Sequence, residues 1–213
     1  MDGLLVDSEK LWHQAELEIL GALGCPIPVD NTRQTKGMYV GEVVQRWFER
    51  SPWDGPTTDE VVEQILDRVG ELATEQDCLL PGVHQTLELV GEAGMTRVLA
   101  SSTPHRLIER ILGHYDLRSS FVAVCSAQDE RYGKPNPAVF LTAAHEAGAV
   151  ARRCVVFEDA PAGVLAAKAA TMVCVAVPEP AEAAHKVIAI ADVVLGSLLE
   201  FTPEVLAGLQ EGL

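Results

Sequence analysis

The feature that most constrains the fold is an alternation of apolar runs and helical segments that begins near residue 82. Helical spacing in VHQTLELVGEAG is followed by the short apolar run TRVLASS, and helical spacing returns in PHRLIERILGHY. The alternation continues through FVAVCSA, PAVFLTAAHEAG, CVVFE, PAGVLAAKAA, MVCVAV and ADVVLG. Continuous apolar strands separated by helices indicate a parallel sheet covered on both faces. This part of the chain is therefore predicted to be a Rossmann-like, doubly wound α/β core.

The preceding segment has a different pattern, which predicts a helical insert. SEKLWHQAELEILGALG and TTDEVVEQILDRVGELATEQ carry apolar residues at helical spacing, and stretches rich in proline and glycine separate the helices. No convincing strand lies between them. We therefore expect an α/β core of residues 1–8 and 79–213, with a helical cap domain of residues 9–78 inserted after the first loop. The expected hinges are residues 6–9 and 78–82.

Composition narrows the range of partners and locations. The 213 residues carry a formal net charge of −15, which disfavours binding to nucleic acid or to anionic membranes. No apolar run approaches the roughly 18 to 20 residues of a bilayer span, and no signal-peptide pattern opens the chain, so a cytoplasmic protein is expected. The five cysteines are widely spaced and odd in number, which indicates free thiols. We expect a monomer or a weak dimer.

Polar residues occur where ligands bind in an open parallel sheet, beyond the carboxyl ends of the strands. The opening stretch MDGLLVD places Asp2 before a glycine, which permits a tight turn. In VLASSTPHRL, Ser101 and Ser102 end a predicted strand, with Thr103 expected at the N-cap of the next helix and Pro104 at its first position. Hydroxyls and free amides at a helix N-terminus can bind an anion.

Two further loops supply a cation and a pair of acids. In RYGKPNPAVF, Pro135 and Pro137 stiffen the chain around Lys134. Glu158 and Asp159 directly follow the apolar run CVVF, and oxygen ligands of this kind suit Mg²⁺. Each loop alone has an ordinary explanation as a turn, a helix cap or a surface lysine. Together they provide a cation site, a phosphate cradle, a fixed positive charge and a carboxylate for proton transfer, which phosphoryl transfer requires.

The order of these loops resembles that of the haloacid dehalogenase-like hydrolases over essentially the whole chain. DGLLVDSE, LASSTPHRLIERIL, GKPNPAVF and VVFEDAPAGVLAAKAA are similar to the family's motifs in order. The helical insert is similar to the cap of the branch that contains β-phosphoglucomutase and the small sugar phosphatases. The resemblance implies a Mg²⁺-dependent phosphatase that acts on hexose, deoxyhexose or hexitol monophosphates through an aspartyl-phosphate intermediate.

The resemblance also implies a role for each matching residue that contacts substrate. Asp2 would be the general acid/base, which protonates the leaving alcohol and later activates water. Ser101, with the Ser102 amide, would hold the phosphoryl oxygens. Lys134 would neutralise charge on the phosphate and on the nucleophile.

The same resemblance implies the metal ligands. Asp159 would bind Mg²⁺ directly, the backbone carbonyl of Asp2 would contact the ion, and Glu158 would lie beside it or act through water. Haloacid dehalogenation needs no Mg²⁺, so the two acids argue against that reaction. A response-regulator receiver has similar polar residues but no helical insert of this length.

One element of the family's first motif is not among the 213 residues. That motif is Asp-x-Asp-Gly after an apolar strand, its first Asp is the nucleophile, and Met1 stands at the x position here. We expect that the chain starts late and lacks the first core strand, because loss of a central strand would leave two facing rows of unpaired backbone groups. The alternative is a non-catalytic protein that binds a sugar phosphate.

The insert bears on the choice between phosphatase and mutase. In the mutases of this branch a basic residue shortly after a Lys-Gly pair grips a second phosphate, whereas here Lys36-Gly37 is followed by MYV. We therefore expect a monophosphatase, with a mutase as the alternative. Arg33 or Arg46 could still grip a second phosphate.

Three aromatic residues of the insert are candidates for the sugar pocket: Trp12, His13 and Trp47. Aromatic residues at helical spacing more often belong to a core, so a structural role for them is the competing interpretation.

Overall fold

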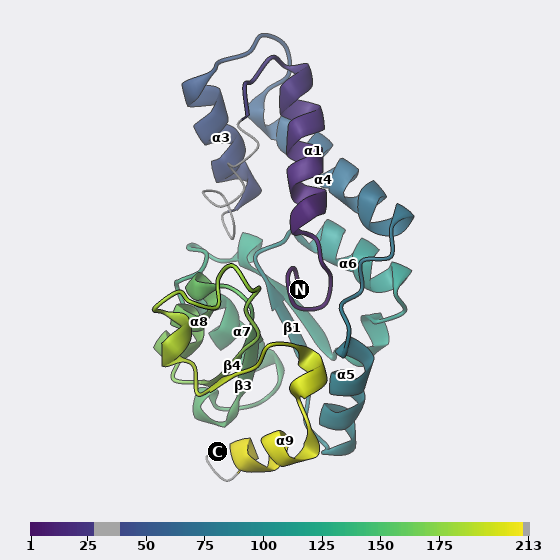
Figure 1. Ribbon diagram of the computed structural model, residues 1–213. Coiled ribbons are helices and arrows are strands. Elements are labelled where there is room, and N and C mark those ends of the chain that lie inside the picture. Colours follow the sequence, from purple (N-terminus) through teal and green to yellow (C-terminus); the bar gives the residue numbers. More distant parts are fainter. Residues whose placement is uncertain (28–38, 211–213) are drawn as a thin grey trace.

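The computed structural model describes residues 1–27 and 39–210, and it has a lower α/β lobe and an upper helical lobe (Figure 1). In the lower lobe, β1 (Val98–Ser101) pairs with β2 (Ala123–Ser126). A second sheet has the order β3 (Val155–Glu158), β4 (Val173–Ala176) and β5 (Val193–Val194). All of these pairs are parallel, so the predicted parallel α/β core is confirmed.

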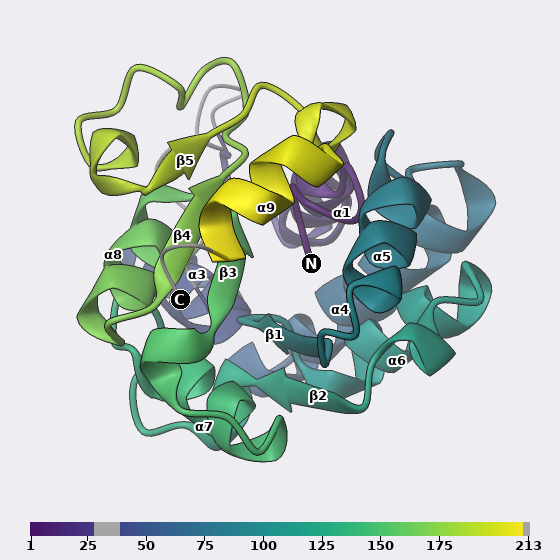
Figure 2. The same cartoon turned by 90° about the horizontal axis from the view of Figure 1, so that it is seen from below.

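The described strands form two sheets, whereas the sequence predicted strands of a single sheet. Figure 2 shows β1 and β3 as neighbouring edges of the two sheets, with the N-terminus close by. Among the described residues, β1 pairs only with β2 and β3 only with β4, because no described strand lies between them. The opening residues instead fold into a tight turn, in which the amide of Leu5 donates to the carbonyl of Met1 at 2.7 Å.

Helices cover both faces of the second sheet. Cys174 and Ala176 of β4 belong to one buried cluster with Val164 of α8 (Pro161–Ala169). Val175 belongs to the other cluster with Leu206 of α9 (Pro203–Gln210). Since alternate residues of a strand point to opposite faces, β4 is buried on both sides.

The remaining core helices follow the predicted alternation. They are α5 (Val83–Glu92), α6 (His105–His114) and α7 (Ala138–Glu146). α7 packs on β1 and β2, and α6 also contacts β2. Each predicted strand and helix of this half is present, with ends shifted by a few residues.

The upper lobe is helical throughout its described part. It contains α1 (Glu9–Ala22), α3 (Val40–Arg50) and α4 (Thr58–Glu75), and both α1 and α3 pack on α4. A capping box fixes the start of α4, because Thr57 and Glu60 exchange hydrogen bonds there. None of the described helices combines the length and the apolar composition that a membrane crossing needs.

Two connecting segments run side by side between the lobes. The amide of Asp7 donates to the carbonyl of Cys78 at 2.7 Å, and the amide of Leu80 donates to the carbonyl of Leu5 at 2.8 Å. These are the segments that the sequence predicted as hinges. Their mutual hydrogen bonds mean that the chain enters and leaves the helical lobe at one place.

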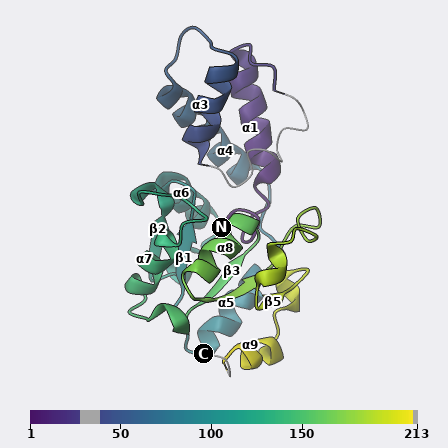
Figure 3. The ribbon, with the colours of Figure 1, turned by 90° about the vertical axis from the view of Figure 1, so that its left-hand side faces the viewer.

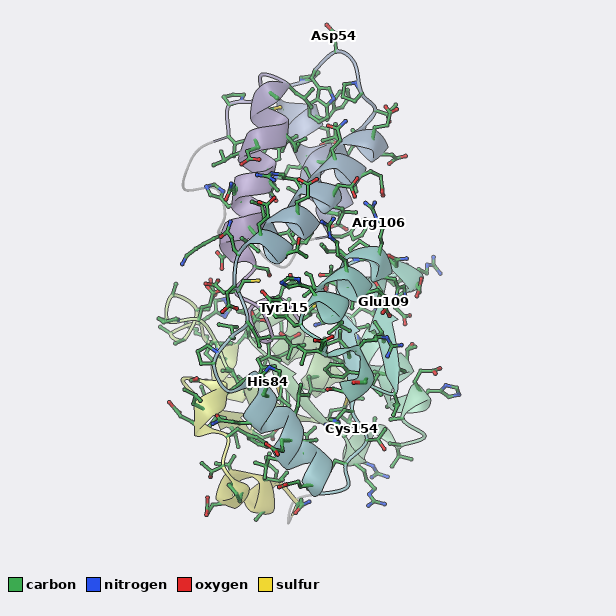
Figure 4. All side chains as sticks on the ribbon, turned by 90° about the vertical axis from the view of Figure 1, so that its right-hand side faces the viewer. Asp54, His84, Arg106, Glu109, Tyr115 and Cys154 are labelled. Carbon is green, nitrogen blue, oxygen red and sulfur yellow. The ribbon has the colours of Figure 1, made fainter. Side chains whose placement is uncertain are left out.

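Tyr115 anchors the end of α4 to the core, and Figure 4 shows it between the lobes. Its hydroxyl accepts from the amide of Cys78 at 2.9 Å and lies 3.2 Å from the carbonyl of Gln76, to which it donates. On the surface nearby, Arg106 of α6 pairs with Asp67 of α4 at 2.7 Å. The helical lobe is therefore fastened to the core along α4 and α6.

We predict that Tyr115→Phe lowers the free energy of unfolding by about 1 to 2 kcal/mol, because it leaves a part-buried amide and carbonyl without their partner. Urea unfolding followed by circular dichroism measures this loss. Tyr132→Phe is the matched control, since Tyr132 is 57% exposed. Equal unfolding midpoints for the two variants would contradict the anchoring role of Tyr115.

Candidate active site

A pocket of about 160 Å³ lies between the two lobes, where α1 and α3 stand over the loops of the core (Figure 3). It is lined by loops that follow β1 and β3 and by the opening turn of the chain. All the predicted site residues line it: Asp2, Ser101, Ser102, Lys134, Glu158 and Asp159. Residues far apart in sequence thus share one pocket, while their individual roles stay predictions.

The carboxylate of Asp2 accepts hydrogen bonds from both lobes. Its Oδ1 accepts from the hydroxyl of Ser8 at 2.6 Å and from the indole N–H of Trp12 at 3.1 Å. Its Oδ2 accepts from the hydroxyl of Thr103 at 2.6 Å. Burial pushes the pKa of Asp2 up. The positive charge of the Met1 amino group and these three donors outweigh burial, so the pKa lies below its ordinary value. The site therefore stabilises the ionised form of Asp2.

The prediction that Thr103 is the N-cap of the helix after β1 was wrong by one residue. The N-cap of α6 is Pro104, and no side chain caps this helix end. Thr103 is buried, and its hydroxyl donates to Asp2. Its amide donates to the hydroxyl of Ser101 at 3.1 Å, and its carbonyl accepts from Ser126 at 2.7 Å.

Lys134 and Glu158 form a buried ion pair at the core side of the pocket. The ammonium of Lys134 contacts Oε1 of Glu158, and the two side chains are 11% and 7% exposed. Oε2 of Glu158 accepts from the amides of Asp159 at 3.0 Å and Ala160 at 3.1 Å. Burial pushes the pKa of Glu158 up, but Lys134 and these backbone contacts outweigh it, so the pKa lies below its ordinary value. Both oxygens of Glu158 thus have protein partners.

Two glycines permit this close packing of acids. A Cβ added to Gly163 would overlap the carboxylate of Glu158. Gly3 has a positive φ of 65°, and a Cβ added there would overlap the carboxylate of Asp159. The Asp159 carboxylate therefore lies directly against the backbone of the opening turn.

Oxygen atoms around Asp159 suit a hard cation such as Mg²⁺. They do not form a cluster of three carboxylates. No group of three His, Cys, Asp or Glu side chains among residues 1–27 and 39–210 is arranged to hold a metal ion. The side chain of Asp2 is committed to its three donors, and Glu158 is committed to Lys134 and to backbone amides. The carboxylate of Asp159 and the backbone carbonyl of Asp2 are oxygen donors of the kind that Mg²⁺ prefers.

The aromatic candidates divide between pocket and core. Trp12 and His13 line the pocket. Trp47 does not; it is buried in the helical lobe, with the guanidinium of Arg50 5.6 Å from its ring centroid. The competing interpretation of a core residue therefore holds for Trp47.

The candidates for a second phosphate grip are not part of the described pocket. Arg33 and Lys36-Gly37 lie outside the described residues. Arg46 is half-buried on α3 and does not line the pocket. Lys134 is the only lysine or arginine among the pocket-lining residues that the structure describes.

Sequence reasoning missed four polar residues of this site: Ser8, Thr103 as a partner of Asp2, Glu9 and Glu16. Glu9, Trp12, His13 and Glu16 all line the pocket and are spaced as one face of α1. In the sequence these residues form a second stripe at helical spacing beside the apolar one. Only the position of the pocket shows that this stripe lines it.

Glu16 is the most unusual of these residues. It is 8% exposed, and it makes no hydrogen bond or ion pair with any residue in the described ranges. Burial alone raises the pKa of Glu16 to about 7. A carboxyl whose folded pKa exceeds its unfolded value destabilises the fold once the pH rises above the unfolded value near 4.5.

We predict that the wild type loses stability relative to Glu16→Gln as the pH rises from about 4.5 to about 7. Over this window the folded protein binds more protons than the unfolded chain, so at pH 8 Glu16→Gln is more stable by on the order of 2 to 3 kcal/mol. Urea unfolding at a series of pH values measures the difference. Glu9 and His13 line the same pocket in both proteins, so their contributions cancel in the difference.

Glu18→Gln makes the same change on the exposed side of α1, where Glu18 pairs with Arg68 at 2.6 Å. It should give no stabilisation at pH 8. If the free energies of unfolding of the wild type and of Glu16→Gln differ by the same amount at every pH, Glu16 is not desolvated in the folded protein.

Comparison with known proteins identifies the family. A family model for haloacid dehalogenase-like hydrolases matches residues 1–171. Hexitol phosphatase B of Escherichia coli K12 is 42% identical over 209 residues, which cover 98% of this chain and 94% of that protein. Fructose-1-phosphate phosphatase YqaB of the same organism is 30% identical over 179 residues, covering 81% of this chain and 90% of that protein.

Solved structures confirm the fold. β-Phosphoglucomutase from Clostridium difficile superposes with a TM-score of 0.84 at 22% identity, covering 97% of this chain and 92% of that chain. CbbY from Rhodobacter sphaeroides superposes with a TM-score of 0.85 at 24% identity, covering 94% and 92%. The predicted resemblance, including its branch, is confirmed. The chain belongs to the haloacid dehalogenase-like hydrolases.

Proposed function

We propose that this chain is a phosphatase that hydrolyses small sugar monophosphates, namely those of a hexose, a deoxyhexose or a hexitol. The observation that carries the proposal is the convergence of Asp2, Ser101, Lys134 and Asp159 on one pocket between the lobes. Its relatives named as hexitol phosphatase and fructose-1-phosphate phosphatase support the substrate class. The predicted cap domain of residues 9–78, of which the structure describes residues 9–27 and 39–78, would cover the pocket.

The phosphate would bind at the core side of the pocket. Ser101 and the amide of Ser102 would donate to the phosphoryl oxygens, and Lys134 would supply the fixed positive charge. The buried ion pair with Glu158 keeps the ammonium of Lys134 in place. Phosphate at this position would meet hydrogen-bond donors and a cation.

Asp2 would transfer protons at the ester oxygen. The hydrogen bonds from Ser8, Trp12 and Thr103 favour its ionised form, which is the form that takes a proton from water. Two of these donors belong to the segment that enters the helical lobe. Closure of that lobe and orientation of the Asp2 carboxylate would therefore be coupled.

The bound cation would be Mg²⁺, held by the carboxylate of Asp159 and the backbone carbonyl of Asp2, with Glu158 beside them. When bound, it would neutralise charge on the phosphoryl oxygens. The protein's own side chains do the rest. Three donors orient Asp2, and Glu158 positions Lys134.

We further propose that the reaction passes through an aspartyl phosphate, with the nucleophilic carboxylate on a strand between β1 and β3. Support comes from the facing edges of the two sheets, which have no partner among the described strands. A parallel strand inserted there would end at the pocket, next to Asp2 and Lys134, because the carboxyl ends of parallel strands share one edge of a sheet.

We predict that Asp2→Asn lowers kcat by about 100- to 10,000-fold, which is the usual contribution of general acid–base catalysis. Asn keeps the size of Asp2, so circular dichroism should show an unchanged fold. Steady-state release of inorganic phosphate from a hexitol phosphate, by the form of the chain that turns over, measures the effect. Lys186→Ala, a change at an exposed lysine, serves as the control with unchanged kcat. Retention of more than a tenth of kcat by Asp2→Asn would refute the role of Asp2.

We predict that turnover with Mg²⁺ requires a longer form of the chain that includes the residues encoded immediately upstream of Met1. The two forms are assayed on a panel of hexose, deoxyhexose and hexitol phosphates, with and without EDTA. Free phosphate from the longer form alone, abolished by EDTA and restored by Mg²⁺, is the expected result. Equal activity of both forms would overturn the inserted strand, and transfer of phosphate between sugar positions would identify a mutase instead.

A further inference from the structure

One face of α1 is aimed into the pocket from the helical lobe. Glu9, Trp12, His13 and Glu16 all line the pocket and recur at helical spacing. Trp12 marks the level of the reaction centre, because its indole N–H donates to Asp2 at 3.1 Å. Glu16 lies one turn further along the same face, about 6 Å along the helix axis.

The environment of Glu16 calls for a hydrogen-bond donor that the described chain does not supply. The residue is 8% exposed and lines the pocket, yet it has no hydrogen bond or ion pair within the described ranges. A buried carboxylate without a donor destabilises a fold, whereas an apolar residue beside the buried Leu11, Ala15 and Leu20 would pack without this cost. The presence of an acid at this position points to a ligand whose donors reach it.

We propose that Glu16 determines specificity by accepting hydrogen bonds from hydroxyl groups of the sugar or sugar-alcohol part of the substrate. This inference rests on the proposed phosphatase function and deepens it, since it names the group that recognises the polyol. Carboxylate oxygens accept readily from vicinal hydroxyls, and these bonds are strengthened by the charge of the acceptor.

The charge distribution of the pocket supports a neutral polyol over a second phosphate. Glu9 and Glu16 place acids on the helical side, while Lys134 on the core side is already paired with Glu158. A second phosphate group at the level of Glu16 would meet carboxyl oxygens instead of a cation, which disfavours a sugar bisphosphate.

The position of Glu16 also sets a minimum length for the substrate. A ligand whose phosphoryl group sits beside Asp2 must extend over about one helical turn, roughly 6 Å, to reach this carboxylate. A hexitol phosphate spans that distance with hydroxyls to spare. Glycerol 3-phosphate can bring only its terminal hydroxyl near that distance, so its hydrolysis should be less sensitive to changes at Glu16.

The test compares the wild type with Glu16→Gln, Glu16→Leu and the control Glu18→Gln in the form of the chain that turns over. Sorbitol 6-phosphate, glycerol 3-phosphate and phenyl phosphate are the substrates. We expect Glu16→Leu to lower the ratio of kcat/KM for sorbitol 6-phosphate to that for phenyl phosphate by roughly 10- to 100-fold. Glu16→Gln, which keeps one acceptor oxygen, should give a smaller loss, and Glu18→Gln should leave the ratio unchanged.

A second readout separates failure of this inference from failure of the proposed function. Calorimetry in EDTA, where no turnover is expected, measures the Kd of sorbitol 6-phosphate and of inorganic phosphate for each protein, and only the affinity for sorbitol 6-phosphate should weaken in the Glu16 variants. If no form hydrolyses any ester, the proposed function fails while the binding data still test Glu16. If both Glu16 variants leave the ratio and the Kd of sorbitol 6-phosphate unchanged, or change all substrates equally, the role assigned to Glu16 is wrong.

Discussion

The carboxylate of Asp2 is the group on which the arrangement of the two lobes around the pocket depends. It accepts from Ser8 and Trp12 at the entrance to the helical lobe and from Thr103 of the core. A buried carboxylate is stable only with such donors, and these donors come from segments about a hundred residues apart. One side chain therefore links the position of α1 to the position of the loop after β1.

A second constraint is the distribution of charged side chains around the pocket. On the core side, the ammonium of Lys134 is fixed by Glu158, whose other oxygen accepts from two backbone amides. On the helical side, Glu9 and Glu16 contribute acids and Val40 and Val43 of α3 contribute apolar surface. The core side also carries the carboxylates of Asp2, Glu158 and Asp159, so Lys134 is the one described lysine or arginine in a pocket lined mainly by acids and apolar residues.

The same pocket shows how function and stability oppose each other. Burial raises the pKa of Glu16 to about 7, so the ionised form is disfavoured in the folded protein. Neighbouring positions on α1 are buried and apolar, which shows that the helix could be packed without an acid here. Residues that lower stability while facing a cavity are the ones that a ligand is expected to compensate.

The sequence by itself determined the elements and the family. Apolar runs separated by helical spacing located every described strand of the core, and four polar loops supplied Asp2, Ser101, Lys134 and Asp159, which line one pocket. These signals are local, because each strand or loop is encoded by its own residues and by the rule that strand ends carry ligands.

Tertiary structure alone decided which side chains pair within the site. The hydroxyl of Thr103 binds Asp2 instead of capping α6, Trp47 packs in the helical lobe while Trp12 reaches Asp2, and the acid of Glu16 faces the pocket. Such contacts join segments that are distant in sequence, and they depend on the rotation of each helix about its axis to within a fraction of a turn. A spacing pattern names the face of a helix, but only the packing of both lobes determines what that face meets.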